Sequence, residues 1–337
     1  MKYRRLGKTN LQISEISMGT WQIADDPEWG KGPEEKDSFK VLQRYIDLGG
    51  NSIDTAWVYG WSEDKPKKHL SEELIGRFLQ QTSQRSKVIL TTKIPPLNQM
   101  WPISKDSRIE NIFPKKHIID CIEDSLRSLQ TDCLDVVLFH VWLDTFNEND
   151  EWKEVCQRLT SQGKVKFWGL SPNYYDPAGC LKTLESGEIS VVQCIFNIFH
   201  QKPITDLFPT AKRLDIGVTS CAPFDEGGLT GKLHKGMTFP HGDFRAQYFA
   251  GSRLDELDRR ISQLTLLLED EATTIPEMAL RYILSFDEVS SVIPGMRNID
   301  YVKANIDLSD GRKLSKITLK ELKRHSWERN FYPWATE

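Results

Sequence analysis

The run Leu134-Asp135-Val136-Val137-Leu138-Phe139-His140 is almost continuously apolar and ends on a histidine. A half-buried strand alternates polar and apolar residues, whereas a continuous run of Val, Leu and Phe is typical of a strand buried on both faces. Such strands occur in parallel sheets that helices cover on either side. The run therefore predicts a buried parallel strand with His140 at its carboxyl end.

Short apolar runs of this kind recur along the whole chain. Eight can be counted, at 14–19, 51–54, 88–93, 134–140, 165–170, 190–196, 216–222 and 289–293. Most are followed by a helical pattern, clearest at 38–48, 71–81, 115–129, 149–162, 203–214 and 299–306. Strand followed by helix, repeated eight times, favours a closed (β/α)8 TIM barrel over an open sheet.

Segments outside the repeat complete the expected fold. Residues 5–11 predict a small hairpin that caps the bottom of the barrel, and 315–328 predict an extra C-terminal helix. The aromatic tail at 331–334 is expected to form a surface patch. Because no linker, low-complexity tract or short repeat interrupts the chain, we expect residues 1–337 to form a single domain.

The bulk composition excludes several classes of partner. A formal net charge of −4 gives no broad attraction to nucleic acid or to anionic lipid. No run approaches the roughly 18 apolar residues that span a bilayer, and the first residues contain no apolar signal core. The six cysteines show neither a CxxC pair nor zinc-ligand spacing. We therefore expect reduced thiols, no metal site and a cytoplasmic location.

Four polar residues lie at, or just past, the downstream ends of three neighbouring strands: Asp54, Tyr59, Lys93 and His140. The carboxyl ends of parallel strands meet on one rim of a barrel. A carboxylate, an ammonium and an imidazole gathered around a phenol alter its proton affinity. Taken alone, each residue has a plainer structural role, as a helix cap, a half-buried aromatic or a core histidine. Together they predict an acid–base site.

At this point a family resemblance can be stated. Ile53-Asp54-Thr55-Ala56-Trp57-Val58-Tyr59-Gly60 resembles the Asp-Thr-Ala-x-x-Tyr-Gly signature of the aldo-keto reductase superfamily. Ser71-Glu72-Glu73-Leu74-Ile75-Gly76 is similar to its Ser-Glu-x-x-Ile-Gly motif, and further matches follow in family order to about residue 306. The segment Asp225-Glu226-Gly227-Gly228-Leu229-Thr230-Gly231-Lys232 looks most like a bacterial, monomer-type branch.

The resemblance implies a reaction and roles for the four residues. A reduced nicotinamide delivers hydride to a carbonyl carbon, and Tyr59 protonates the oxygen. Lys93 beside it favours the phenolate, and Asp54 holds and polarises Lys93. His140, expected to be neutral, donates a hydrogen bond to the substrate oxygen. The implied activity is NADPH-dependent reduction of aldehydes or ketones to alcohols, with a small carbonyl or alcohol as partner.

The resemblance also implies how the cofactor is held. Ser171, Asn173 and Gln193 bind the nicotinamide carboxamide, and Gly19, Thr20 and Trp21 line its approach beside Asp54. Residues 222–232 lie across the pyrophosphate, with Lys232 pairing with phosphate. Gly295 and Arg297 open the last barrel helix, where backbone N–H groups and a guanidinium suit the 2′-phosphate of NADP. The full set expected to bind the cofactor is Gly19, Thr20, Trp21, Asp54, Ser171, Asn173, Gln193, Cys221, Pro223, Phe224, Gly227, Lys232, Gly295, Arg297, Tyr301 and Asn305.

Three positions depart from the family pattern. Pro172 separates Ser171 from Asn173, and Tyr301 replaces a residue that is often polar in the family. Cys221 stands where the family often has a tyrosine under the nicotinamide. We therefore expect either that the nicotinamide ring is held more loosely or that Phe196 or Trp21 takes over the stacking. These changes affect the cofactor contacts rather than the group of four.

Other functions remain open from the sequence. A non-catalytic NADP(H)-sensing barrel, of the kind that serves as an accessory channel subunit, keeps the same four residues. A dehydrogenase that oxidises a sugar or an alcohol uses the same site in reverse. A metal-dependent barrel hydrolase is disfavoured, because only His140 of the histidines lies at a strand end. NADP is preferred over NAD mainly because of Arg297, and we expect a monomer or a weak oligomer.

Overall fold

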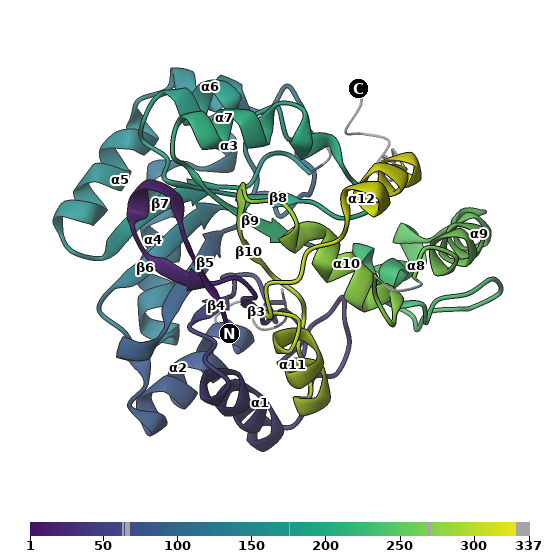
Figure 1. Cartoon of the computed structure of the whole chain (residues 1–337). Helices are drawn as coiled ribbons and strands as arrows, with labels where there is room; N and C mark the ends of the chain where they lie inside the picture. The colour runs from purple at the N-terminus through teal and green to yellow at the C-terminus, as the bar shows by residue number, and fades with distance from the viewer. Residues whose placement is uncertain (63, 65–67, 175, 269–270, 328–337) are drawn as a thin grey trace.

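Eight parallel strands curve into a ring that helices surround (Figure 1). The computed structural model describes residues 1–62, 64, 68–174, 176–268 and 271–327. The predicted aromatic tail at 331–334 lies outside these residues. The strands of the ring are β3 (Met18–Gly19), β4 (Ser52–Asp54), β5 (Ile89–Ile94), β6 (Leu134–Phe139), β7 (Val165–Leu170), β8 (Val191–Ile195), β9 (Gly217–Cys221) and β10 (Val289–Val292).

Backbone contacts between the first and last strands close the ring. Neighbouring strands pair in parallel from β3 through to β10. Parallel bridges then join Ile16 to Val292 and Gly19 to Gly295, and the amide of Ser17 donates to the carbonyl of Val292 at 2.8 Å. A Cβ at Gly19 would lie 3.1 Å from both Ile293 and Pro294, so this close approach favours glycine. The predicted (β/α)8 barrel is confirmed.

The N-terminal hairpin plugs the bottom of the barrel. Its strands β1 (Tyr3–Arg5) and β2 (Gln12–Ser14) pair antiparallel. Leu6 and Ile13 are buried in a cluster with Val136, Leu138 and Val191 of the barrel strands. Alternate side chains of a barrel strand point inward, so these apolar contacts fill the barrel interior. The predicted capping hairpin is confirmed.

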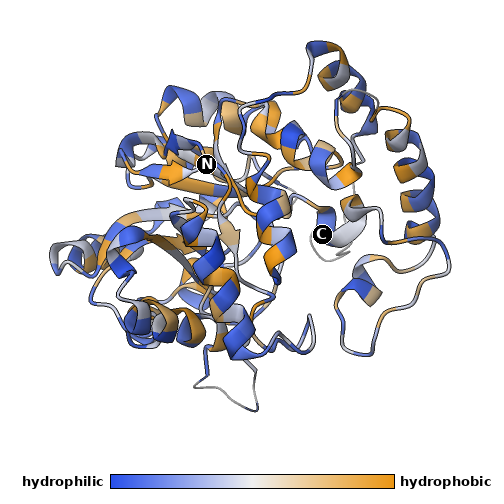
Figure 2. Cartoon of the chain, turned by 60° about the horizontal axis from the view of Figure 1, so that its bottom comes forward, coloured by the Kyte–Doolittle hydropathy of each residue, from blue (hydrophilic) through white to orange (hydrophobic). Residues whose placement is uncertain are grey.

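Most helices present one apolar stripe to the strands and polar residues to water (Figure 2). In α4, Ile118, Cys121 and Ile122 are buried while Lys115 and Lys116 are exposed. The helices are α1 (Glu35–Asp47), α2 (Leu70–Thr82), α3 (Ile109–Ile112), α4 (Lys115–Ser128), α5 (Glu151–Ser161), α6 (Leu181–Glu185), α7 (Leu207–Arg213), α8 (Arg245–Tyr248), α9 (Arg253–Thr265), α10 (Ile275–Leu284), α11 (Ile299–Ile306) and α12 (Lys316–Leu322).

The helix predictions need some corrections. The predicted helix at 203–214 is a short 3-10 turn, Lys202–Ile204, followed by α7, because Pro203 falls at the start of the turn. The predicted C-terminal helix is α12 with a 3-10 turn at Lys323–His325, and residue 328 lies outside the described residues. Five helices were not predicted, namely α3, α6, α8, α9 and α10. In α10 the charged residue Arg281 is buried with the apolar residues around it, so it interrupts the apolar pattern on which the prediction relies.

All six cysteines are free thiols. Within the described ranges, no helix is long and apolar enough to cross a bilayer.

Candidate active site

The four residues singled out at strand ends meet at the carboxyl end of the barrel. Asp54 ends β4, Lys93 lies near the end of β5, and His140 directly follows β6. The ammonium of Lys93 donates to Asp54 Oδ1 at 2.5 Å, to the carbonyl of Thr55 at 2.7 Å and to the hydroxyl of Tyr59 at 3.3 Å. Three neighbouring elements therefore bring an ammonium within hydrogen-bond distance of both a carboxylate and a phenol.

This ammonium is deeply buried and must be compensated. Lys93 is 1% exposed and Asp54 4% exposed. A buried charge is tolerated when it is paired and hydrogen-bonded, and Lys93 uses all three of its N–H donors. Asp54 is held from a second side, because Gln193 Nε2 donates to its Oδ2 at 2.8 Å. Gln193, expected at the nicotinamide carboxamide, thus extends the network around Asp54.

Tyr59 retains its proton in this environment. Burial, and after it the charge of Asp54, raise the pKa of the phenol well above 10. From the sequence we expect the opposite direction, because the charge of Lys93 favours the phenolate and so lowers the pKa of the phenol. In the structure desolvation dominates, so the phenol is protonated at neutral pH. That is the form a proton donor requires.

His140 is held in its neutral form. Burial, together with the positive charge of Lys93, lowers its pKa well below 6.5. Its Nδ1 is buried and has no hydrogen-bond partner among the described residues. The imidazole contacts the rings of Tyr59 and Trp101 edge-on, with centroids 6.0 and 5.5 Å apart. A neutral imidazole can donate one hydrogen bond without adding charge to the site.

Aromatic rings surround the phenol. Trp21 stacks on Tyr59 with centroids 5.2 Å apart and an interplanar angle of 12°. Trp29 and Phe244 pack in turn against Trp21, at 5.6 and 5.9 Å. Phe244 belongs to the long segment after β9, so loops from two strands meet beside the phenol. These contacts restrict the position of the Tyr59 ring.

One aromatic expectation is corrected. Phe196 is fully buried and packs against Phe208 and Tyr282, so it cannot stack on the nicotinamide in place of a tyrosine at position 221. Trp142, two residues after His140, is also fully buried, and its indole donates to Thr183 Oγ1 at 2.9 Å. Both positions contribute packing between the strands and the outer helices.

The residues expected at the cofactor phosphates come together from β9 and β10. Lys232 Nζ donates to the hydroxyl of Tyr301 at 2.6 Å, which joins the segment after β9 to the first turn of α11. Arg297 is exposed just before α11. Neither Lys232 nor Arg297 forms an ion pair with a residue of the described ranges. Two cations without a carboxylate partner fit the phosphates of a dinucleotide.

The remaining expected cofactor residues are placed as follows. The hydroxyl of Thr20 donates to the carbonyl of Asp54 at 2.8 Å and is fully buried. The side chain of Asn173 is engaged twice by the backbone of Ile103, at 3.0 and 3.1 Å. Ser171 follows β7 and is half-buried, and Asn305 is buried in α11. Cys221, Pro223, Phe224 and Gly227 lie at the end of β9 and in the segment that follows it.

Comparison with known proteins agrees with this geometry. The family model described as "Aldo/keto reductase family" matches residues 15–326. The chain belongs to the aldo/keto reductase family. The aldo-keto reductase YhdN of Bacillus subtilis (strain 168) is 27% identical over 307 residues, which cover 90% of this chain and 87% of that protein.

Other relatives of this aldo/keto reductase differ in function. A probable voltage-gated potassium channel subunit beta of Arabidopsis thaliana is 26% identical over 322 residues, covering 92% of each chain. The solved structure of a glycerol dehydrogenase from Gluconobacter oxydans superposes with a TM-score of 0.76 and 26% identity, covering 96% of this chain and 94% of the other. The chain is therefore an oxidoreductase of this family, as the strand-end residues and the ordered motifs indicated.

Sequence reasoning missed one buried carboxylate of this aldo/keto reductase. Asp26, between β3 and α1, is 6% exposed and accepts hydrogen bonds from the indole of Trp21 and from the backbone of Gly60. The only sequence signal is an acidic pair, Asp25-Asp26, in a turn-rich segment between two tryptophans. Nothing local indicates which of the two carboxylates is buried.

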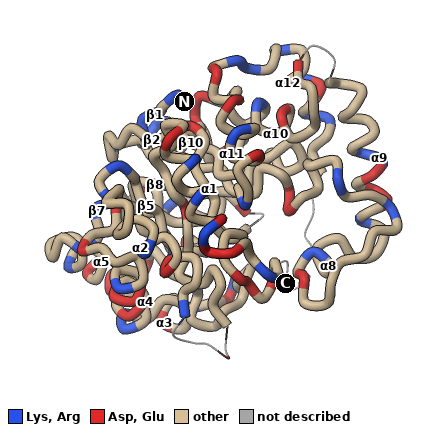
Figure 3. The backbone as a smooth tube through the Cα atoms, turned by 90° about the horizontal axis from the view of Figure 1, so that it is seen from below, with Lys and Arg blue, Asp and Glu red and all other residues tan. Residues whose placement is uncertain are grey.

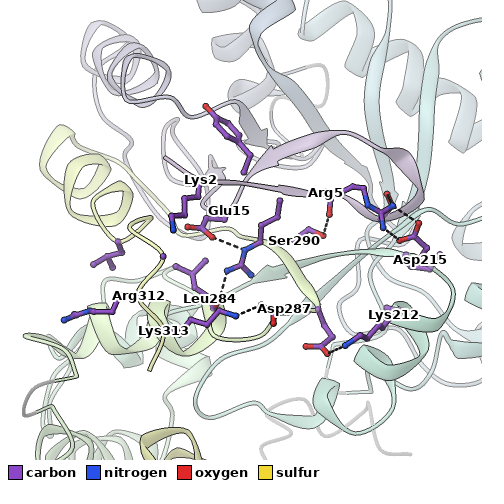
Figure 4. Close-up of a pocket in the computed structure, with 18 residues that line it drawn as sticks. Lys2, Arg5, Glu15, Lys212, Asp215, Leu284, Asp287, Ser290, Arg312 and Lys313 are labelled. Carbon is purple, nitrogen blue, oxygen red and sulfur yellow. Dashed lines mark hydrogen bonds and ion pairs between the residues drawn. The ribbon is translucent and has the colours of Figure 1, made fainter. Parts of the chain in front are cut away.

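A separate pocket of about 600 Å³ lies at the other end of the barrel (Figure 4). It is bounded by the N-terminal hairpin and by residues around β10. Most of its cationic side chains are paired, among them Arg5 with Asp215, Lys212 with Glu288, and Lys313 with Asp287. Because these charges are already paired with one another, we assign the ion pairs around this pocket to the stability of the fold and not to catalysis.

Proposed function

We propose that this protein reduces aldehydes or ketones to alcohols with NADPH, and that Tyr59 is the proton donor. The observation that carries the proposal is the position of the Lys93 ammonium, 2.5 Å from Asp54 and 3.3 Å from the hydroxyl of Tyr59. A phenol is a weak acid at neutral pH, so it needs a neighbouring cation at the moment it releases its proton.

Each residue then has one task. When bound, NADPH supplies the hydride that reduces the carbonyl carbon. Tyr59 gives its proton to the oxygen on which negative charge develops. Lys93 stabilises the phenolate left behind, and Asp54 keeps Lys93 charged and directed at it. Neutral His140 donates a hydrogen bond to the substrate oxygen and so orients the carbonyl. A fixed donor and cation require little reorganisation during the reaction.

The cofactor would be held at three places. Ser171, Asn173 and Gln193 would bind the carboxamide end, beside Gly19, Thr20 and Trp21. Pro223, Phe224, Gly227 and Lys232 would lie along the pyrophosphate, and Gly295, Arg297, Tyr301 and Asn305 would hold the adenosine end. The guanidinium of Arg297 is exposed and has no carboxylate partner among the described residues. It supports NADP over NAD, because the 2′-phosphate would supply the negative charge that pairs with it. We further propose a single-domain, cytoplasmic protein that is a monomer or a weak oligomer.

Tyr59→Phe tests the proposal directly. Removing the hydroxyl should lower kcat by about 10²–10⁴-fold, the usual contribution of general acid catalysis, and leave the dissociation constant of NADPH within a few-fold. The assay follows loss of NADPH absorbance over a panel of aldehydes and ketones, with binding measured by quenching of tryptophan fluorescence. Near-normal turnover by this variant would show that Tyr59 is not the donor.

The similarity to a channel subunit supports a second candidate, a barrel that binds NADP(H) as a sensor. It predicts tight NADPH binding with no measurable turnover of any carbonyl or alcohol. The glycerol dehydrogenase supports assaying the oxidative direction as well. NADPH binding together with turnover in either direction would exclude the pure sensor.

A further inference from the structure

Asp26 links two segments that flank the candidate proton donor. Its Oδ2 accepts from the indole Nε1 of Trp21 at 2.8 Å and from the backbone amide of Gly60 at 2.9 Å. Its Oδ1 accepts from the amides of Glu28 and Trp29 at 2.9 and 3.3 Å. One buried carboxylate thus receives four N–H donors. The amides of Glu28 and Trp29 belong to the same turn as Asp26, whereas the donors from Trp21 and Gly60 lie on the side of the site.

Both residues that donate to Oδ2 lie directly beside Tyr59. Trp21 stacks on the ring of Tyr59, and Gly60 is the next residue after Tyr59 in the chain. Gly60 has a positive φ of 76°, and a Cβ there would lie 2.7 Å from Leu70 and 2.8 Å from the carbonyl of Asp25. The backbone beside Tyr59 is therefore fixed in a conformation that favours glycine.

A purely local role would not require the bonds to Oδ2. The turn that contains Asp26 is already closed by two backbone hydrogen bonds between Asp26 and Gly30, at 2.8 and 3.0 Å. The amides of Glu28 and Trp29 occupy Oδ1 in the manner of an Asx turn. Burying the carboxylate is costly, because burial raises its pKa against the effect of its four donors. Asp26 differs from an ordinary turn residue because it also accepts hydrogen bonds from Trp21 and Gly60, which lie outside its turn.

We propose that Asp26 is a positioning residue for the reaction proposed above: it fixes Trp21 on one face of Tyr59 and the backbone at Gly60, and so holds the phenol against Lys93. The proposal rests on the proposed role of Tyr59. Small misplacements of a reacting group can cost about 10²-fold in rate, whereas cofactor binding does not depend on the orientation of this hydroxyl.

Asp26→Ala removes all four acceptor contacts. We expect kcat to fall by about 10²-fold, while the NADPH dissociation constant rises by less than about tenfold, because Trp21 is only one of the residues proposed to hold the cofactor. Asp26→Asn keeps one amide oxygen and should be intermediate, a partial rescue at similar size. The matched control is Asp25→Ala, since Asp25 is exposed and its carboxylate accepts only from the amide of Gly32 among the bonds between described residues. Its kcat should stay within about twofold.

Trp21→Phe tests the same link without touching the carboxylate, and it serves if Asp26→Ala folds poorly. It removes the indole N–H but keeps an aromatic ring. If Asp26 acts through Trp21, the double variant Asp26→Asn/Trp21→Phe should lose less than the product of the two single losses. Independent, multiplying losses in kcat would overturn the link.

A spectroscopic reading separates this inference from the proposed function. The near-ultraviolet circular dichroism of the tryptophan band should change in Asp26→Ala and in Trp21→Phe, but not in Asp25→Ala. If the wild-type protein turns over no carbonyl, the proposed function fails, yet this spectrum still tests the position of Trp21. A spectrum and a kcat that are unchanged in Asp26→Ala would overturn the inference.

Discussion

His140 is the member of the site whose ordinary pKa lies nearest to physiological pH. In the folded protein burial and Lys93 lower that pKa well below 6.5. The unfolded chain has no such environment and takes up the proton near pH 6.5. His140 therefore binds a proton less readily in the folded protein than in the unfolded chain. As a result, the free energy of unfolding depends on pH.

The sign of this dependence can be predicted. Below about pH 6.5 the unfolded state binds the proton and the folded state does not, so stability falls as the pH falls. One such histidine contributes at most about 1.4 kcal/mol per pH unit. In His140→Gln the decline of the urea midpoint between pH 7.5 and 5 should be shallower than in the wild type. Since His69, His117 and His325 also have lowered pKa values, only the difference between the two proteins is diagnostic. Parallel curves would contradict the prediction.

Lys93→Met should lower the free energy of unfolding, because it breaks the buried ion pair with Asp54 from one side. Removing the ammonium leaves the carboxylate of Asp54 buried, with Gln193 as its remaining side-chain donor. Breaking a buried pair from one side costs about 3–5 kcal/mol. We expect Lys93→Met to lose about that much unfolding free energy in urea. Asp54→Asn/Lys93→Met should recover part of it, because no unpaired charge remains. A double variant less stable than the single one would argue against charge compensation.

Among the elements, α10 shows best how burial and charge act together. Residues 278–284 are all buried, and Arg281 at 3% exposure is one of them. Its guanidinium pairs with Glu277 at 2.8 Å and with Asp310 at 2.9 Å. The side chain of Thr274 caps the helix by accepting from the amide of Glu277. The helix thus ties the outer layer of the barrel to the segment that follows α11.

Arg281→Met should destabilise the protein in a pH-dependent way. Burial raises the pKa of Glu277, but hydrogen bonds from Thr273 and Arg281 outweigh it and lower the pKa to about 2. The stability from this carboxylate is therefore present above pH 4.5 and is lost as the pH falls toward 2. At pH 7 we expect Arg281→Met to lose about 3 kcal/mol. The gap to the wild type, measured from urea midpoints, should narrow from pH 5 to pH 3. A constant gap would rule out the ionised pair as the cause.

The same helix shows where sequence reasoning succeeds and where it ends. Several of the eight strands were predictable because a short, continuously apolar run has few other solutions. Helices with one apolar face, such as α4, were predictable for a similar reason, whereas the buried part of α10 includes the charged residue Arg281, which interrupts the apolar pattern. The strand-end positions of Asp54, Lys93 and His140 followed from the strands. Asp26 could not be found, because its partners Trp21 and Gly60 meet it only in three dimensions.

At the scale of the whole molecule, residues of both charges alternate along the described backbone (Figure 3). The candidate site and the charged pocket lie at opposite ends of the barrel. In barrel enzymes the carboxyl end of the strands carries the chemistry and the other end carries stability. Besides its apolar contacts, the hairpin that closes the bottom is tied to the barrel by Arg4, which binds Glu15 and the carbonyls of Leu284, Phe286 and Val289.

Arg4→Met and Arg5→Met form a matched pair that tests whether the bottom of the barrel contributes to stability but not to catalysis. Arg4 is largely buried and its donors meet backbone carbonyls at the end of α10, so its loss should cost about 3 kcal/mol of unfolding free energy. Arg5 pairs with Asp215 at a site where both side chains are about half exposed, so its loss should leave the urea midpoint almost unchanged. Both variants should keep kcat and the NADPH dissociation constant within about twofold, because neither residue touches the end that carries Tyr59. Urea midpoints and turnover measured on the same preparations decide the matter. A loss of turnover in Arg4→Met under conditions where it remains folded would show that the two ends of the barrel are coupled.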